Sequence, residues 1–310
     1  MKINLANIKK AKKLLDKREC VAVPTETVYG LAGNAYSDQA CKKIFKLKKR
    51  PKNNPLIVHY FNIKKLMNDC KLNSVFLKLY DQFCPGPITF ILKLKKNSKI
   101  SKVATNKKGN LAIRFPKHPI IRNLLKQIEY PLAAPSANIS SKVSAVSSAD
   151  VKEDFGKKIK YILEGGKSSI GVESTIIDLK NKPTILRLGG IEIASIEKVL
   201  KKKIIINDNP KKISAPGQSK LHYSPGIPVR LNVEKIKNDE AYLLIKNTNK
   251  VKPNYYFLSK KGDLKEAARN LYSTLRKIKK AKYKSIAVQK IPNKGLGKTI
   301  NDRLLRASKY

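Results

Sequence analysis

The stretch V-A-V-P-T-E-T-V-Y-G-L occupies residues 21–31 and is the best starting point for predicting the fold. Its apolar start predicts a short buried strand, which the proline ends because it has no N–H to give to a sheet. If the segment stays extended, its side chains alternate, so that Thr25, Thr27 and Tyr29 share one side and Glu26 faces the other. Two hydroxyls and a phenol beyond a strand predict a site for a small polar ligand, and a turn without such a role is the alternative.

Outward from this stretch, helix and strand patterns are mixed along the whole chain. Apolar residues at helical spacing predict helices, and short apolar or β-branched runs predict strands. Predicted helices cover residues 5–18, 38–49, 62–69, 73–83, a segment after 119, 192–201, 263–280 and 297–308, and predicted strands cover 20–23, 55–60, 88–94, 111–115, 131–134, 175–179, 184–188, 241–245, 255–258 and 285–289. Strands and helices that intermix without strict alternation predict an α/β fold with a mixed sheet.

Composition divides the 310 residues into two folded parts. Residues 204–228 contain lysines followed by S-A-P-G-Q-S-K-L-H-Y-S-P-G-I-P, and such a concentration of Gly, Pro and Ser is typical of a linker. We therefore predict a large N-terminal domain over residues 1–203 and a small C-terminal α/β domain over residues 229–310.

Charge is the most unusual property of this composition. The chain has 67 Lys and Arg against 22 Asp and Glu, a formal net charge of +45. Such an excess indicates a polyanionic partner such as RNA, DNA or the phosphates of a nucleotide. The alternative is a compositional bias, because only 10 of the 67 are Arg, and phosphate recognition favours the arginine fork. The arginines are therefore the more informative cations.

Several other classes of protein are excluded by the sequence. The four cysteines (Cys20, Cys41, Cys70 and Cys84) have no zinc-ligand spacing, and the three histidines lie far apart, so we expect no metal site made of protein side chains. No apolar run approaches the ~20 residues that cross a bilayer. The first residues also lack the pattern of a secretory signal. We expect a cytoplasmic protein with reduced thiols and no membrane contact.

The motif F-K-L-K-K-R-P at residues 45–51 carries two cations at the end of a predicted helix. The proline ends the helix, because its ring disfavours a helical conformation at the preceding residue. Lys48 and Arg50 are placed where they could bind the phosphates of a nucleotide. A simpler explanation is that they complement the helix dipole.

Two further motifs place polar groups beside predicted strands. A-A-P-S-A-N-I-S at residues 133–140 offers the hydroxyl of Ser136 and the amide of Asn138 in a tight space. T-I-L-R-L-G-G at residues 184–190 brings Arg187 out of an apolar strand beside two glycines. A guanidinium next to glycine backbone suits an anion, because the backbone can approach closely there.

Together and in order, these motifs resemble the YrdC family. P-T-E-T-V-Y-G-L, K-x-R, N-P-L-I-V-H, S-x-N, E-S-T-I-I-D and L-R-x-G follow one another along the chain. The linker P-G-x-x-x-x-H-Y-x-P and the end I-N-D-R-L-L-R-A resemble the two-domain branch of the family, the threonylcarbamoyl-AMP synthases. The resemblance runs from about residue 5 to residue 308 and implies a YrdC-like twisted mixed sheet, joined by a long linker to a small Rossmann-like α/β domain.

The resemblance implies a nucleotidyltransferase reaction. L-threonine, bicarbonate and ATP would give L-threonylcarbamoyl-AMP and pyrophosphate, the first step of N6-threonylcarbamoyladenosine formation in tRNAs that read ANN codons. The implied partners are threonylcarbamoyl-transferase proteins that act on tRNA, with weak RNA binding as an additional expectation, and Mg²⁺ would be bound with ATP. Such a reaction needs positioning and charge stabilisation, which fits motifs made of hydroxyls, amides and cations.

By the same resemblance, site residues carry over position by position. The expected contacts to threonine or its carbamate are Thr27, His59, Arg114 and Ser174. The expected contacts to ATP are Lys48, Arg50, Asn54, Ser136, Asn138, Ser144, Arg187 and Tyr223, with Lys48 and Arg50 as the catalytic cations nearest the phosphates. Tyr223 would reach back from the linker as a lid that becomes ordered when ATP binds. Asn110 departs from the family pattern, because many relatives are expected to have a threonine there, and Ala134 occupies another place where a threonine hydroxyl can occur.

Two other functions stay open at this point. A YrdC-like RNA-binding module without catalysis would bind RNA with a steep salt dependence, although it would have no need of the K-x-R and S-x-N motifs. A carbamoyl-adenylating maturation factor with a similar domain would carry paired-cysteine zinc fingers, which this sequence lacks.

Overall fold

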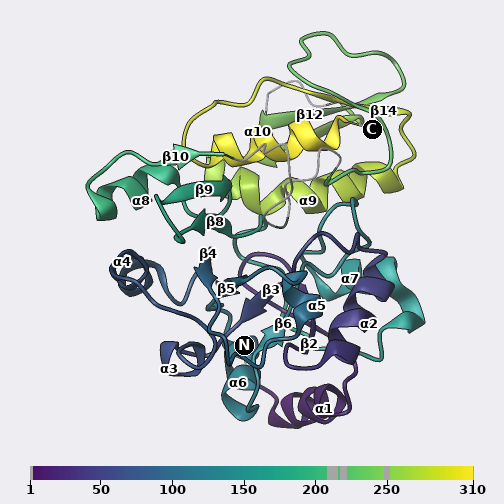
Figure 1. The fold of residues 1–310 in the computed structure, drawn as a ribbon. Coiled ribbons are helices and arrows are strands. Elements are labelled where there is room, and N and C mark those ends of the chain that lie inside the picture. Colours follow the sequence, from purple (N-terminus) through teal and green to yellow (C-terminus); the bar gives the residue numbers. More distant parts are fainter. Residues whose placement is uncertain (1–2, 208–215, 217–221, 248–251, 310) are drawn as a thin grey trace.

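The structure, a computed structural model, describes residues 3–207, 216, 222–247 and 252–309. Over these residues it contains two sheets (Figure 1). The larger has ten strands in the order β10-β9-β8-β4-β5-β3-β6-β2-β1-β7 and mixes parallel with antiparallel pairs. The smaller has four parallel strands in the order β11-β14-β12-β13. The predicted α/β fold, with a mixed sheet followed by a small α/β unit, is confirmed.

All of the predicted helices and strands are present, and the structure adds further short elements. The helices are α1 (Leu5–Asp16), α2 (Asp38–Lys48), α3 (Ile63–Leu66), α4 (Ser74–Phe83), α5 (Lys102–Thr105), α6 (Pro119–Gln127), α7 (Ser148–Phe155), α8 (Ile193–Leu200), α9 (Leu264–Lys280) and α10 (Leu296–Ala307), with a 3₁₀ turn over Gly156–Lys158. The strands are β1 (Val21–Val23), β2 (Gly30–Asn34), β3 (Ile57–His59), β4 (Ile88–Lys93), β5 (Asn110–Arg114), β6 (Leu132–Ala133), β7 (Tyr161–Ile162), β8 (Thr175–Asp178), β9 (Thr184–Arg187), β10 (Ile205–Ile206), β11 (Val229–Arg230), β12 (Glu240–Lys246), β13 (Tyr255–Ser259) and β14 (Ser285–Val288). The short strand β10 lies inside the segment expected to be linker.

Both faces of the large sheet are covered, as the apolar pattern of β1 requires. Val21 and Val23 pack in one cluster with α1 and α6, while Ala22 packs in another with α2, α4 and α8. Three successive buried residues on a strand therefore indicate a strand covered on both sides. Four of these helices, α1, α2, α4 and α6, begin at side-chain caps, for example where Ser37 accepts a hydrogen bond from the backbone N–H of Ala40.

A single apolar cluster joins the two parts of the chain. Val28 and Val172 of the N-terminal part share it with Tyr223 of the linker and with Leu271 and Tyr272 of α9. Burying apolar surface across a domain boundary favours one relative placement of the domains. In Figure 1, α9 accordingly lies against the upper side of the N-terminal part. None of the helices in the described ranges is both long and apolar enough to cross a membrane.

Candidate active site

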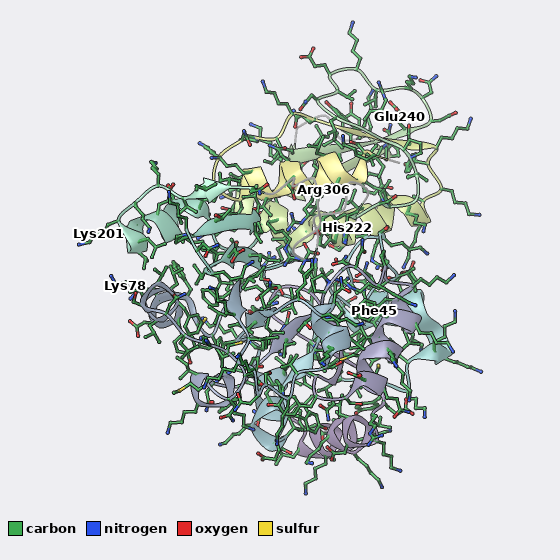
Figure 2. All side chains as sticks on the ribbon, viewed as in Figure 1. Phe45, Lys78, Lys201, His222, Glu240 and Arg306 are labelled. Carbon is green, nitrogen blue, oxygen red and sulfur yellow. The ribbon has the colours of Figure 1, made fainter. Side chains whose placement is uncertain are left out.

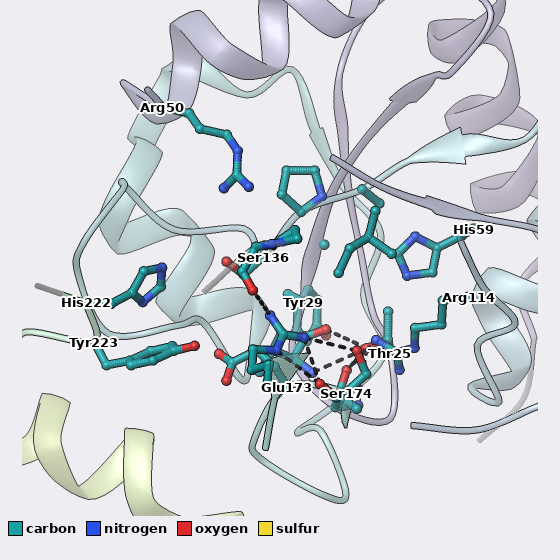
Figure 3. Close-up of a pocket in the computed structure, with 18 residues that line it drawn as sticks. Thr25, Tyr29, Arg50, His59, Arg114, Ser136, Glu173, Ser174, His222 and Tyr223 are labelled. Carbon is teal, nitrogen blue, oxygen red and sulfur yellow. Dashed lines mark hydrogen bonds between the residues drawn. The ribbon is translucent and has the colours of Figure 1, made fainter. Parts of the chain in front are cut away.

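A small buried cavity lies where the ends of several strands meet the linker (Figure 3). Its volume is about 40 Å³, which holds a few water molecules at ~10–15 Å³ each. The wall is made by the β1–β2 turn, the ends of β3, β5 and β9, the segments after β6 and before β8, and the linker. The lining residues are Thr25, Thr27, Val28, Tyr29, Gly30, Arg50, Ile57, His59, Arg114, Ala134, Pro135, Ser136, Glu173, Ser174, Arg187, Pro216, His222 and Tyr223.

The β1–β2 connection is a turn, and not the extended segment that the sequence predicted. The hydroxyls of Thr25 and Thr27 share a hydrogen bond of 2.9 Å. Arg114, the last residue of β5, donates from Nη1 to Thr27 Oγ1 (2.8 Å) and from Nη2 to Glu26 Oε1 (2.6 Å). Thr25, Thr27 and Tyr29 line the cavity and Glu26 does not, as predicted, although the turn lets the Arg114 guanidinium reach both Glu26 and Thr27.

His59 ends β3 and lies opposite Arg114 in the parallel pair β3–β5. Its side chain is buried, and neither ring nitrogen makes a hydrogen bond of normal geometry to a described residue. Burial, and then the charge of Arg114, lowers the pKa of His59 well below its usual value, so the ring is neutral at pH 7. Because buried polar atoms are almost always paired, this imidazole is a candidate ligand contact.

Arg50 reaches the cavity because α2 ends just before it. Lys49 adopts a left-handed backbone conformation (φ 52°) that turns the chain there. The Arg50 guanidinium donates from Nε to the backbone oxygen of Asn54 (2.9 Å), and from Nη2 to Asn54 Oδ1 (2.6 Å) and the Pro55 oxygen (2.8 Å). Burial, and then the charge of Arg187, lowers the pKa of Arg50 to about 9, which leaves it cationic at neutral pH. Asn54 lies behind Arg50 and orients it.

Lys48 lies behind the cavity wall. Its Nζ donates to the backbone oxygens of Ser136 and Asn138, both at 2.5 Å, and the side chain is buried. Burial, and then the charge of Arg50, lowers the pKa of Lys48 well below its usual value. The Asn138 amide in turn donates to two backbone oxygens of its own loop. Lys48 and Asn138 therefore shape the loop that carries Ser136 into the cavity.

Arg187 joins the end of β9 to the start of β8. Its Nε and Nη2 donate to the backbone oxygen of Ser174 (3.1 and 2.8 Å), and its Nη1 donates to the oxygen of Pro216 in the linker (3.2 Å). The backbone of Gly189 lies so close to this segment that an added Cβ would be 2.3 Å from the carbonyl carbon of Ser174. The glycine is therefore required for the close approach that the motif predicted.

Glu173 is a functional candidate that the sequence reasoning missed, although it stands in the E-S-T-I-I-D motif. It is the only acid among the described residues that line the cavity. Its carboxylate accepts hydrogen bonds from Ser144 Oγ (2.6 Å), from the Tyr272 hydroxyl (2.8 Å to Oε2) and from Arg303 Nε (2.9 Å). Burial opposes the charge, but Arg303 and Arg187 outweigh it and lower the pKa of Glu173 to about 2.

The linker closes the cavity with His222 and Tyr223 (Figure 3), and Figure 2 shows His222 between the two parts of the chain. The Tyr223 ring stacks on Tyr272 (centroids 5.7 Å apart), with the Arg303 guanidinium 4.7 Å from its centroid. The Tyr223 hydroxyl and His222 Nδ1 are buried without a hydrogen-bond partner in the described part of the chain. Burial lowers the pKa of His222 to about 3 and raises that of Tyr223 to about 12, so both are neutral at pH 7.

The structure brings the predicted site residues together in two shells. Those that line the cavity are Thr27, Arg50, His59, Arg114, Ser136, Ser174, Arg187 and Tyr223, and those one contact behind it are Lys48, Asn54, Asn138 and Ser144. Of the two departures from the family pattern, Ala134 lines the cavity and Asn110 does not. His222 was quoted in the linker motif but was not singled out, because a lone histidine in a linker carries no signal of its own.

This arrangement can bind an elongated anion that also carries hydroxyl groups. Figure 3 shows Arg50 and Arg114 on different sides of the cavity. Arg187 contributes a third guanidinium, which donates to the backbone oxygen of Ser174. His59, His222 and Tyr223 line the same cavity and contribute polar atoms without hydrogen-bond partners among the described residues. Guanidinium groups suit phosphate and carboxylate oxygens, and the neutral rings suit hydroxyls and amides.

Comparison with known families accounts for most of the chain. The Sua5/YciO/YrdC family, described as telomere recombination, matches residues 13–189, and the C-terminal domain of threonylcarbamoyl-AMP synthase matches residues 191–309. The chain belongs to the Sua5/YciO/YrdC family. Threonylcarbamoyl-AMP synthase of Pyrococcus abyssi is 36% identical over 94% of this chain and 90% of its own length. The Bacillus subtilis enzyme of the same name is 35% identical over 98% of this chain and 94% of its own.

A solved structure supports membership of the two-domain branch of the Sua5/YciO/YrdC family. The crystal structure of P. abyssi Sua5 complexed with L-threonine superposes with a TM-score of 0.91 at 34% identity. It covers 100% of this chain and 96% of the other. The two parts of the chain therefore share both their folds and their relative placement with that protein.

Proposed function

We propose that this protein synthesises L-threonylcarbamoyl-AMP from L-threonine, bicarbonate and ATP, with release of pyrophosphate. The relatives of that name match along more than nine-tenths of the chain, and the superposed structure is a complex with L-threonine. The single observation that carries the proposal is the cavity itself. It gathers three buried guanidinium groups and unpaired neutral polar atoms at the family's motif positions.

The two ends of the cavity suit the two substrates. Arg114 and Thr27 are already hydrogen-bonded to each other beside His59, and this end would bind the carboxylate and hydroxyl of threonine. Arg50 and Arg187 would bind the phosphates of ATP at the other end. The threonine carbamate formed with bicarbonate would then lie within reach of the α-phosphate.

The reaction needs no strong general base, because the attacking carbamate oxygen is already an anion. Its attack on the α-phosphate forms the mixed anhydride and releases pyrophosphate, so the reaction is a nucleotidyl transfer. Fixed cations stabilise the charge that builds on the phosphates, and binding both substrates in one cavity positions them. Arg50 supplies such a cation, and Lys48 fixes the loop beside it.

ATP cannot enter the cavity in the form described. A volume of about 40 Å³ is far too small for a nucleotide, and Pro216, His222 and Tyr223 close it from the linker side. We therefore infer that this part of the linker withdraws to admit ATP and returns over it, which excludes water from the reactive anhydride.

Magnesium would arrive as the complex with ATP. Glu26 and Glu173 are the carboxylates nearest the cations of the site, and each is already held by an arginine and by other donors. Mg²⁺ commonly keeps phosphate and water ligands and uses few protein ligands. We further propose a cytoplasmic location, and transfer of the product to partner proteins that act on the adenosine beside the tRNA anticodon.

The test is pyrophosphate release from purified protein with ATP, Mg²⁺ and bicarbonate, with and without L-threonine, and without tRNA. We expect release that depends on threonine and on bicarbonate and that serine at equal concentration does not reproduce. A folded protein that binds ATP and threonine but releases no pyrophosphate would contradict the proposal.

A further inference from the structure

A second hollow lies beside the active site, between α2 and α5. It is an open groove of about 720 Å³, and Lys42, Lys46, Lys49, Lys52, Lys102 and Lys107 line it. Phe45 and Val103 give it an apolar floor, and Figure 2 labels Phe45 at this position. None of the site residues predicted from the sequence lines this groove, apart from Arg50.

The lysines of the groove are not balanced by acids. None of the six is in an ion pair with a carboxylate of the described residues. The one acid in the lining, Asp38, accepts a hydrogen bond from the Ser101 hydroxyl (2.5 Å). Like charges gathered around a hollow repel one another, and a bound anion would relieve this repulsion.

The lysines of the groove come from two segments that are far apart in the sequence, which distinguishes the groove from a single basic segment. Lys42 and Lys46 belong to α2, whereas Lys102 comes from α5, far away in the sequence. The dipole of α2 can account for cations in its own last turn, but not for those contributed across the groove by α5.

Arg50 forms the wall between the groove and the active-site cavity. It lines both hollows, and its guanidinium is fixed from behind by Asn54 and Pro55. The groove therefore begins where the proposed phosphate end of the cavity stops. The lysines of the groove are therefore the cations that adjoin Arg50 on the side away from the cavity.

We propose that this groove binds inorganic pyrophosphate, the leaving group of the proposed reaction, as a site outside the catalytic cavity. Ammonium groups from two walls match the spread negative charge of pyrophosphate, and the open form of the groove leaves the ion exchangeable with solvent. The identification of the anion as pyrophosphate rests on the proposed function. The expectation that the groove binds an anion rests only on the lysines that line it.

The experiment compares two charge-matched variants. Lys46→Gln combined with Lys102→Gln removes one ammonium from each wall, and Lys198→Gln combined with Lys202→Gln removes the same charge at the exposed end of α8, away from α2 in Figure 1. Calorimetric titration with sodium pyrophosphate measures binding directly. In the native protein and in the α8 variant we expect a second class of pyrophosphate sites, weaker than the catalytic cavity. In the groove variant this second class should be lost, or its Kd should rise roughly three- to tenfold.

Threonine-dependent exchange between ATP and labelled pyrophosphate gives the second readout. The KM for pyrophosphate should rise about three- to tenfold in the groove variant only, while the KM for ATP stays unchanged. Equal effects in both variants would overturn the proposal, because they would show only a general charge effect. The proposal would also be overturned if tRNA binds in the groove and the groove substitutions leave the Kd for pyrophosphate unchanged. If even the native protein shows no exchange, the proposed function fails, and the titration still decides whether the groove binds the ion.

Discussion

Among single residues, Glu173 is placed to make stability depend on pH. Its folded pKa of about 2 lies below its ordinary value of 4.5. The stabilisation it contributes is therefore complete above about pH 4.5 and is lost as the pH falls toward 2. Glu173→Gln should destabilise the fold by about 3 kcal/mol at pH 7, because the buried Arg303 loses one of its two carboxylate partners. Thermal unfolding from pH 7 to pH 3 should show this difference shrinking.

A matched control for this variant is Glu234→Gln at an exposed position. That change should leave the unfolding temperature nearly unaltered at every pH. A Glu173→Gln protein whose deficit stays constant down to pH 3 would contradict the role of the ionised carboxylate.

Secondary-structure elements differ in how far the sequence reveals them. The helices α2 and α9 were predicted to within one residue at each end, because both combine a strong apolar stripe with a capping side chain. The strand β2 was missed, since G-L-A-G-N has no β-branched residue and its burial comes from pairing with β1 and β6. The helix α7 was missed despite its capping box of Ser147 and Asp150, because only two of its residues are buried.

The linker is the element that controls access to the site. Substitutions of Tyr223 can distinguish the packing of its ring from a contact of its hydroxyl with the ligand. Tyr223→Phe keeps the ring between Tyr272 and Arg303 and removes only a buried, unpaired hydroxyl. The unfolding temperature should be unchanged or higher, while the KM for ATP should rise about three- to tenfold if the hydroxyl binds the nucleotide. Steady-state kinetics with ATP varied at saturating threonine measures this.

Tyr223→Ala serves as the comparison, because it should lower both stability and ATP affinity. Unchanged ATP kinetics in the folded Tyr223→Phe protein would mean that the hydroxyl does not touch the nucleotide. The earlier expectation that the linker becomes ordered on ATP binding falls partly on residues 208–215 and 217–221, outside the described residues.

At the scale of the whole molecule, the motifs predicted which residues gather at the site but not how the second domain takes part. Each motif contains polar residues of one short segment, so the resemblance could assign Ser174 and Arg187 to the same site. In the structure the two side chains are hydrogen-bonded to each other. The contact from Arg303 to Glu173 joins positions 130 residues apart. No local pattern signals such a contact, and its origin lies in the packing of α10 against the E-S-T and L-R-x-G segments.

Arg303 connects the C-terminal domain to the active-site wall, because it contacts Glu173 and Tyr223, which both line the cavity. Its side chain is fully buried, and it donates to Glu173 Oε2, to the backbone oxygen of Leu188 (2.6 Å) and to the neighbouring Asp302 while it lies over the Tyr223 ring. Arg303→Met keeps much of the volume but removes the cation that is hydrogen-bonded to Glu173, which leaves Arg187 as the arginine that still acts on its charge. We expect the KM for ATP to rise about tenfold or more, with threonine affinity changed by less than about threefold.

Arg276→Met is the control that separates this effect from a loosened domain contact. Arg276 also crosses between the domains, to Asp154 (2.8 Å) and to the backbone oxygen of Val143, but none of these three residues lines the cavity. Both variants should unfold at lower temperature, and only Arg303→Met should weaken ATP binding measured by calorimetry. Equal losses of ATP affinity would mean that the second domain supports the site through general packing. A loss confined to Arg303→Met would identify this arginine as the positioning residue through which the second domain holds the nucleotide end of the cavity.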